Sequence, residues 1–203
     1  RHDADFPFPE TYSFVVASSG VAAEKTGTAR DSYNRISRMV SEVTSTVGRG
    51  LTFSRMFEEF GVDEVLSKIR GMRSAFMTRD LLSRVEQFRI ENFEIIPSVI
   101  EMLAAGRIAD IGDAIDISQE NAERFLGNQI TETSFLQRSA REIGVVAASA
   151  FGAGFGGSVY ALLTRSDAEG FKAEWQRVYR NRFPQHSGVC EFFTARPSEC
   201  DLG

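Results

Sequence analysis

The sequence predicts an α+β fold, with one mostly antiparallel four-stranded sheet and helices packed on one of its faces. Four short apolar runs have the composition of β-strands, and the segments between them carry apolar residues at helical spacings of three and four. The two middle runs are joined only by a glycine-rich loop. Because no repeat, low-complexity stretch or linker interrupts the chain, residues 1–203 are interpreted as a single domain.

The chain begins with a predicted strand over residues 12–17, which ends at Ser18-Ser19-Gly20. A helix is expected to begin at Thr26 or Thr28. Its apolar positions alternate at spacings of three and four residues: Tyr33, Ile36, Val40, Val43 and Val47. The segment Gly48-Arg49-Gly50 is expected to end this helix, because glycine readily adopts the backbone conformation of a helix C-cap.

Four helices are predicted in the middle of the chain, over residues 53–60, 62–69, 75–105 and 108–126. Gly61 separates the first two. The third has the longest helical pattern, and Pro97 is expected to kink it because proline has no amide hydrogen and clashes with the preceding turn. Gly106 ends it, and the fourth helix is expected to pack back against it.

The last third of the chain combines predicted strands over residues 144–148, 158–163 and 189–194 with predicted helices over 131–142 and 167–182. Thr131, Thr133 and Ser134 offer N-caps for the first of these helices. The first two of these strands flank the glycine-rich loop, so this unit is strand, loop, strand.

The composition excludes several classes of protein. A net charge of −5 and a pI near 5.2 argue against a nucleic-acid partner, because nucleic-acid-binding domains usually carry a basic face. No apolar run approaches the roughly 18 residues that span a bilayer, and the polar N-terminus shows no signal peptide. The two cysteines and two histidines lack metal-ligand spacing. We therefore expect a cytoplasmic protein without a membrane partner and without a metal site in this chain.

The glycine-rich loop is the most informative segment, because four of the six residues from 152 to 157 are glycine. Glycine permits positive φ angles and lets backbone N–H groups approach a bound anion or sugar. The loop fits the G-x-G-x-x-G string of dinucleotide-binding folds, but those need a helix where residues 158–163 predict a strand. It also fits the loop of protein kinases, whose other motifs this sequence lacks. A tight hairpin without a ligand remains the alternative to a site.

Four stretches, in this order, resemble the C-terminal half of galactokinase-like sugar kinases, which belong to the GHMP small-molecule kinases. The stretches are Ser19-Gly20-Val21, Asp31-Ser32-Tyr33-Asn34-Arg35, the helical segment from Arg84 to Asn92, and Gly152 to Gly157 followed by Ser158-Val159. The resemblance covers nearly the whole chain, from Phe14 to Thr194. It implies the ferredoxin-like C-terminal domain of a GHMP kinase.

The resemblance also implies an activity, the ATP- and Mg²⁺-dependent transfer of the γ-phosphoryl group to a sugar hydroxyl, which we expect to be the anomeric one. In the family, the phosphate loop, the metal ligands and the catalytic aspartate lie in the N-terminal lobe, and nothing in this sequence matches those motifs. We therefore expect no catalytic residue in this chain and no activity of the chain alone. The expected partners are ATP, a small sugar and the N-terminal kinase lobe; an isolated lobe should expose an apolar face that favours self-association.

The resemblance assigns two site features to this chain. The backbone of the loop is expected to line the nucleotide and substrate site; its residues are Gly152, Ala153, Gly154, Phe155, Gly156 and Gly157. Tyr33 corresponds to a tyrosine that contacts the sugar, although its position also fits the apolar stripe of its helix. The sequence departs from the family pattern at Ser149 (usually Arg or Lys), Gln119 (usually His), Phe151 (usually Thr) and Ala153 (usually Gly).

Two groups of charged residues are interpreted as structural. Glu86 and Glu91, with Arg84 and Arg89, have the spacing of ion pairs within one helix or of a solvated helix face. Three aspartates at a spacing of three predict a solvated acidic face rather than a cation site: Asp110, Asp113 and Asp116.

Two other functions remain open. One is a kinase-like protein that senses sugar or nucleotide without turnover, which the departures from the family pattern favour. The other is an interaction domain of the same shape without a ligand. Because the residues that read the sugar hydroxyls lie mostly outside this chain, galactose, a uronic acid, arabinose and an amino sugar all remain candidate substrates.

Overall fold

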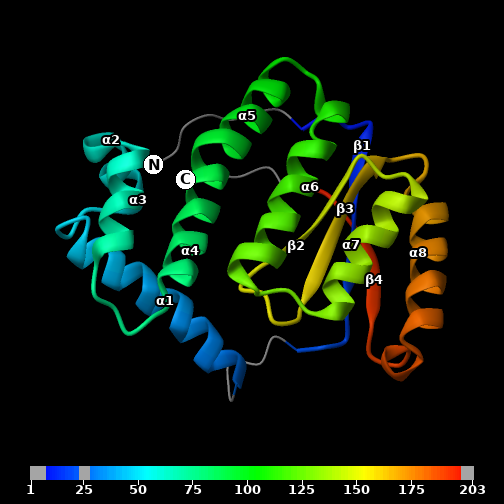
Figure 1. Ribbon diagram of the computed structural model, residues 1–203. Helices are drawn as coiled ribbons and strands as arrows, with labels where there is room; N and C mark the ends of the chain where they lie inside the picture. Colours follow the sequence, from blue (N-terminus) through cyan, green and yellow to red (C-terminus); the bar gives the residue numbers. More distant parts are fainter. Residues whose placement is uncertain (1–7, 23–27, 198–203) are drawn as a thin grey trace, which may run out of the picture.

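The computed structural model describes residues 8–22 and 28–197 of the chain. The strands form one sheet in the order β2-β3-β1-β4, and every pairing is antiparallel. They are β1 (Tyr12–Ser18), β2 (Ala147–Phe151), β3 (Ser158–Thr164) and β4 (Glu191–Ala195). The predicted α+β class, with a four-stranded antiparallel sheet, is confirmed (Figure 1).

One face of the sheet is closed by two helices, α7 (Thr131–Ile143) and α8 (Ala168–Arg182). Successive residues of a strand point to opposite faces, so every second residue reaches this layer. Val15 of β1 and Ala161 of β3 are paired across the two strands and are completely buried. Trp175 of α8, also completely buried, packs in the same cluster.

The opposite face of the sheet is only partly covered. Phe14 and Leu162, which are paired across β1 and β3, belong to a small cluster with Ile108 and Ile111. The residues of β1 that point to this face are half-buried, in regular alternation with the fully buried residues of the closed face. The covering on this side comes from α5 (Ile96–Ala104), the segment after it and the start of α6 (Gly112–Asn121), which contribute Val99, Met102, Leu103, Ile108, Ile111 and Ile115 to this cluster.

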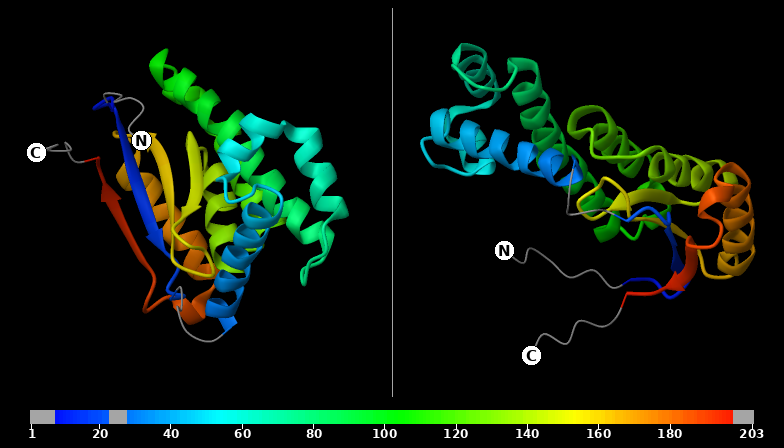
Figure 2. Two further views of the ribbon diagram at one scale, coloured as in Figure 1. Left: turned by 90° about the vertical axis from the view of Figure 1, so that its left-hand side faces the viewer. Right: turned by 90° about the horizontal axis from the view of Figure 1, so that it is seen from below.

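A second hydrophobic core lies beside the sheet, within a group of four helices that project away from it (Figure 2). These are α1 (Thr28–Thr46), α2 (Phe53–Phe60), α3 (Val62–Gly71) and α4 (Thr78–Ile90). Their inward residues, such as Val43, Met56 and Leu81, are almost completely buried. No helix in the described ranges is both long enough and apolar enough to cross a membrane.

The long helix predicted over residues 75–105 is divided into three parts. After α4 comes a π-helical turn, Glu91–Ile95, and then α5 (Ile96–Ala104), whose first turn contains Pro97. Because proline has no N–H to donate to the turn before it, the wider π turn accommodates it directly upstream. The helix predicted over 108–126 is similarly divided into a 3-10 turn, α6 (Gly112–Asn121) and a π-helical turn.

The second strand begins later than predicted, at Ala147 instead of residue 144. The reason is that α7 continues to Ile143 and is capped by Gly144, whose φ is 112°. Val145 and Val146 then carry the chain from the helix into the sheet. The last strand also begins later than predicted, at Glu191.

The two edges of the sheet are different. The outer edge of β2 faces α6, and Gln119 of that helix accepts a hydrogen bond from the Ala150 amide (2.9 Å). At the other edge, β4 is largely exposed and, among the described residues, pairs only with β1. The edge that leads into the glycine loop is therefore the supported one.

Candidate functional site

The glycine loop, residues 152–157, connects β2 to β3 at one end of the sheet. Five of its six residues have positive φ angles, among them Phe155 with φ 60°. Residues with a side chain rarely adopt such angles, so a loop of this shape requires its glycines. The predicted unit of strand, glycine loop and strand is present in the structure.

The middle of the loop is packed tightly against two other segments. A Cβ atom on Gly154 would lie 2.2 Å from the carbonyl oxygen of Asn128, and one on Gly156 would lie 2.7 Å from that of Val21. The Phe155 amide donates to the Asn128 carbonyl, and the Gly157 amide donates to the Val21 carbonyl (2.9 Å). Gly154 and Gly156 are therefore needed for the close approach of backbone to backbone.

The rim of the loop is open. A Cβ atom on Gly152 or on Gly157 would meet no atom within 4 Å, and both Gly152 and Ala153 are exposed. The amides of Gly152 and Ala153 donate no hydrogen bond to any residue in the described ranges. A fixed loop with free N–H groups at its rim has the geometry of an anion-binding site.

Two of the positions that depart from the galactokinase pattern contact one another. The side-chain oxygen of Gln119 accepts hydrogen bonds from the Ser149 hydroxyl (3.1 Å) and from the Ala150 amide (2.9 Å). Gln119 is 2% exposed, and its amide nitrogen donates to Glu123 (3.0 Å). Phe151, the third departure, is exposed at the end of β2.

Tyr33 belongs to α1, but its side chain lies outside the part of the structure that is described. Its contact with a sugar therefore stays a prediction. Asn128, by contrast, was not singled out in the sequence, although the structure places it against the glycine loop. Its one sequence signal is the preceding Gly127, which has φ 59° and ends the π-helical turn after α6.

The acidic residues of the long helical segment have two different partners. Glu86 forms the predicted ion pair within its helix, with Arg89 (2.8 Å), and the hydrogen bond from this guanidinium lowers the pKa of Glu86. For Glu91 the prediction is wrong, because its carboxylate accepts a hydrogen bond from Ser118 of α6 (2.8 Å). Burial, with a smaller contribution from the charge of Glu91, raises the pKa of Tyr160 to about 12.

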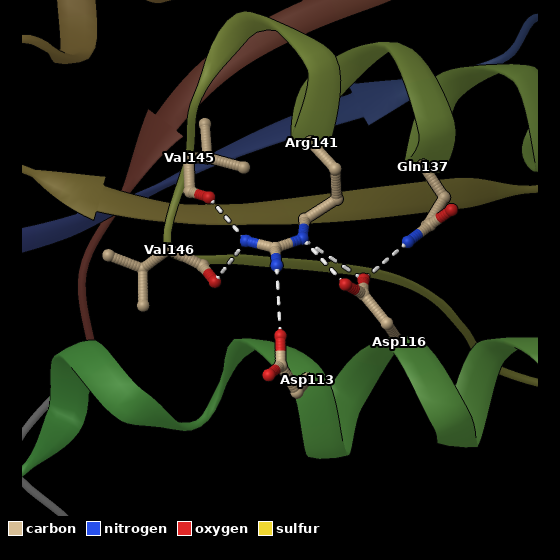
Figure 3. A network of polar contacts seen from close by, with 6 residues as sticks. All are labelled: Asp113, Asp116, Gln137, Arg141, Val145 and Val146. Atoms are coloured by element: carbon tan, nitrogen blue, oxygen red, sulfur yellow. Dashed lines mark hydrogen bonds and ion pairs between the residues drawn. The ribbon is translucent and has the colours of Figure 1, made fainter.

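The prediction of a solvated acidic face is also wrong for one aspartate (Figure 3). Asp116 accepts two hydrogen bonds from the Arg141 guanidinium, at 2.9 and 3.0 Å, and one from Gln137 (2.9 Å). The same guanidinium donates to the carbonyls of Val145 and Val146. This cluster ties α6, α7 and the start of β2 together. Its role is structural, because the Arg141 guanidinium and the Asp116 carboxylate are bound to one another and to groups of the surrounding chain.

The described residues include no group of three or more His, Cys, Asp or Glu side chains that could hold a metal ion. The aspartates of α6 supply no such group, because Asp116 is bound to Arg141, and Asp113, whose side chain is almost fully exposed, lies 3.8 Å from the same guanidinium.

Comparison with known proteins identifies the fold and its relatives. Residues 99–181 match a family model described as GHMP kinases C terminal. The galactokinase of Thermococcus kodakarensis is 26% identical over 196 residues, which are 95% of this chain and 49% of that protein. The crystal structure of Lactococcus lactis galactokinase complexed with galactose matches with a TM-score of 0.71 and 20% identity, over 92% of this chain and 45% of that one.

A more distant structure has a related fold. The L. major mevalonate kinase in complex with R-mevalonate matches 92% of this chain and 43% of its own, with 14% identity and a TM-score of 0.51. These matches confirm the resemblance inferred from the motifs: residues 99–181 are similar to the C-terminal region of GHMP kinases, and most of the chain is similar to galactokinases in sequence and in fold. It spans about half the length of these relatives.

Proposed function

We propose that this chain is the C-terminal lobe of an ATP-dependent, galactokinase-like sugar kinase, which transfers the γ-phosphoryl group of ATP to the anomeric hydroxyl of a sugar. In this proposal residues 1–203 form its single GHMP kinase C-terminal domain. The observation that carries the proposal is the ordered glycine loop, with an open rim, on a domain homologous to galactokinases.

In the proposed site, residues Gly152 to Gly157 form a wall beside the nucleotide and the sugar. The amides of the exposed residues Gly152 and Ala153 donate no hydrogen bond within the described ranges. In this proposal they would donate to a bound anion and stabilise negative charge on the phosphoryl group. The contacts with Asn128 and Val21 hold the loop in place before a ligand arrives. A loop that is already ordered loses less conformational entropy on binding. We assign no proton transfer to it.

The remaining machinery is assigned to an N-terminal lobe, because the chain spans about half the length of its relatives. That lobe would supply the phosphate loop, the aspartate base and most contacts to ATP and Mg²⁺. When bound, Mg²⁺ would neutralise charge on the transferring phosphoryl group. The described residues of this chain include no group that could hold the ion. Tyr33 is proposed to contact the sugar, and the cytoplasm is proposed as the location.

The proposal is tested by measuring ADP release from the full-length protein with Mg²⁺-ATP across a panel of free sugars. The panel contains galactose, arabinose, a uronic acid and an amino sugar. Turnover with one of them would support the kinase and identify its substrate. A matched panel of 1-O-methyl glycosides tests the anomeric assignment, because these block the hydroxyl that is proposed to receive the phosphoryl group.

The role of the loop is tested with Gly154→Val. The added side chain would collide with the Asn128 backbone, so turnover should fall about 100-fold or more while the sheet stays folded. Gly61→Val is the matched control, because Gly61 also has a positive φ (74°) but no atom near its missing side chain. Unaltered turnover in Gly154→Val would contradict the site role of the loop.

A second candidate function is a sensor that binds sugar or nucleotide without turnover. It is favoured by Ser149, whose hydroxyl is engaged with Gln119 where the relatives usually carry a cation, and by the exposed Phe151. For a sensor, no sugar in the panel would release ADP, while a sugar or ATP would still raise the melting temperature. An interaction domain without a ligand would show neither response.

A further inference from the structure

The two ends of the glycine loop are anchored in unlike strands. The loop enters β3, a central strand, at Ser158, which is paired with Phe151 on one side and Ser18 on the other. It leaves from β2, an edge strand that pairs with β3 alone. An edge strand has no ladder partner on its outer side, so the position of its end depends on contacts with other elements.

Gln119 of α6 supplies such a contact near the end of the edge strand β2. Its side-chain oxygen accepts hydrogen bonds from the Ala150 amide and the Ser149 hydroxyl. Both residues lie within two positions of Phe151, where β2 ends. The amide nitrogen donates to Glu123, one turn further along the chain. A carboxamide nitrogen can only donate and its oxygen can only accept, so Glu123 fixes which end faces the strand. The side chain is 2% exposed, so water hardly competes for these hydrogen bonds.

We propose that Gln119 is a positioning residue, which fixes the end of β2 and thereby the place from which the glycine loop reaches bound nucleotide and sugar. Its effect on the loop follows from the geometry alone, whereas its effect on catalysis rests on the proposed kinase function. Gln119 holds the strand through its oxygen and is assigned no contact with the ligands. Losing that oxygen should therefore weaken ligand binding more than it slows the chemical step.

The first variant is Gln119→Met in the full-length protein, because methionine has a similar length and apolar packing but no strong hydrogen-bond acceptor. Amide hydrogen exchange over residues 150–157 is expected to rise about tenfold, while exchange in β1 stays unchanged. With Mg²⁺-ATP and the accepted sugar, the KM for ATP should rise about tenfold and kcat should change less than about twofold. Glu120→Gln is the matched control, since Glu120 is exposed on the same helix and forms no hydrogen bond among the described residues.

The two measurements separate this inference from the proposed function. Hydrogen exchange reports on the loop even if the protein transfers no phosphoryl group, so an inactive protein with faster loop exchange supports the anchoring role and refutes the kinase. Unchanged loop exchange in folded Gln119→Met overturns the inference, whatever the activity. Faster exchange with an unchanged KM in an active enzyme overturns the link to ligand binding.

Two further variants guard against a protein that does not fold. Ser149→Ala removes one of the two hydrogen bonds to the Gln119 oxygen and should raise loop exchange about threefold; an unchanged rate overturns the inference. Q119E alone places two carboxylates at the 3.0 Å contact with Glu123 and should loosen the loop. In Q119E/E123Q, donor and acceptor exchange places across this contact, so loop exchange and KM should return toward the parent values. A double variant as impaired as Q119E overturns the assignment.

Discussion

The two hydrophobic cores of the molecule are built on different principles. The core beneath the sheet gathers residues from Val15 to Cys190, whereas the core among α1 to α4 uses only residues between 36 and 88. The buried polar side chains that are described all lie in or beside the sheet layer: Ser13, Ser19, Gln119, Asn121, Asn128, Thr133, Gln137 and Ser139. The helical core is a local, apolar support, and the sheet core contains the polar contacts that position the glycine loop.

Helix α8 contributes polar contacts to the sheet core. Trp175 donates from its indole nitrogen to the Leu136 carbonyl and the Ser139 hydroxyl, both at 3.1 Å. The Tyr179 hydroxyl donates to the carbonyl of Ser19 (2.6 Å), in the segment that also contacts Gly157. Disturbing the sheet core should therefore change the candidate site, whereas disturbing the helical core should not.

The largest effect is expected for Trp175→Ala, which removes a completely buried ring and two hydrogen bonds. Such truncations cost about 3–5 kcal/mol of unfolding free energy, and here hydrogen exchange should also rise in the glycine loop. Met56→Ala, at a completely buried position of the helical core, should cost about 2–5 kcal/mol and raise exchange only in residues 28–90. Both are measured by denaturant unfolding and hydrogen exchange of the full-length protein. Faster loop exchange in Met56→Ala would show that the cores are coupled.

A smaller effect is expected for Tyr179→Phe, which keeps the ring and leaves the Ser19 carbonyl without its hydrogen bond. An unpartnered buried acceptor costs about 1–3 kcal/mol. Tyr12→Phe is the control, because the Tyr12 hydroxyl forms no hydrogen bond with the described residues. Equal melting temperatures for the two variants would show that the Tyr179 hydroxyl does not hold this segment.

The protein should lose stability at alkaline pH because of Tyr160, which lies on the partly covered face of the sheet. Burial, together with Glu91, raises the pKa of its hydroxyl to about 12, whereas an exposed tyrosine titrates near 10. Above pH 10 the Tyr160 hydroxyl loses its proton in the unfolded chain but keeps it in the folded protein. The stability that is fully present below pH 10 is therefore lost as the pH rises toward 12. Tyr160→Phe cannot titrate and should lose less stability over the same range. Urea midpoints at a series of pH values measure this, and parallel curves would exclude Tyr160 as the cause.

The smallest effect is expected for Arg35→Ala at the surface of the helical core. Arg35 pairs with Asp80 at 2.6 Å and joins α1 to α4, but its side chain is 46% exposed. Exposed ion pairs contribute less than about 1 kcal/mol, and salt weakens them further. In high salt, Arg35→Ala should therefore have nearly the same urea midpoint of unfolding as the parent protein. A loss as large as that of Met56→Ala would mean that the helical core depends on this pair.

Most elements of the fold could be predicted from periodicity alone, because each helix has an apolar stripe and each strand an apolar run. The helix over 53–60 was predicted with the bounds that the structure shows. The kink expected at Pro97 did not specify the π-helical turn over residues 91–95, and tertiary contacts set the ends of elements at Gly144 and Ala147. Neither effect has a periodic signal.

The candidate site was predicted in part. The glycine loop could be found because glycine is required both for positive φ and for close packing, and such a dense cluster stands out in a sequence. The partners of the loop could not, because Asn128 and Gln119 are ordinary polar residues whose importance depends on what lies opposite them. Asp116 was misinterpreted for the same reason: its partner, Arg141, lies 25 residues away.

The unequal edges of the sheet also determine where the protein is open to association. On the β2 side, α6 already occupies the place that a fifth strand would take. The exposed β4, with Phe193 48% exposed, is the edge on which another chain could align its backbone, and Glu191 is the charge on this strand that discourages it. Removing that charge would favour aggregation through β4. The added strands would then lie on the far side of β1 from the β2–β3 hairpin that carries the glycine loop.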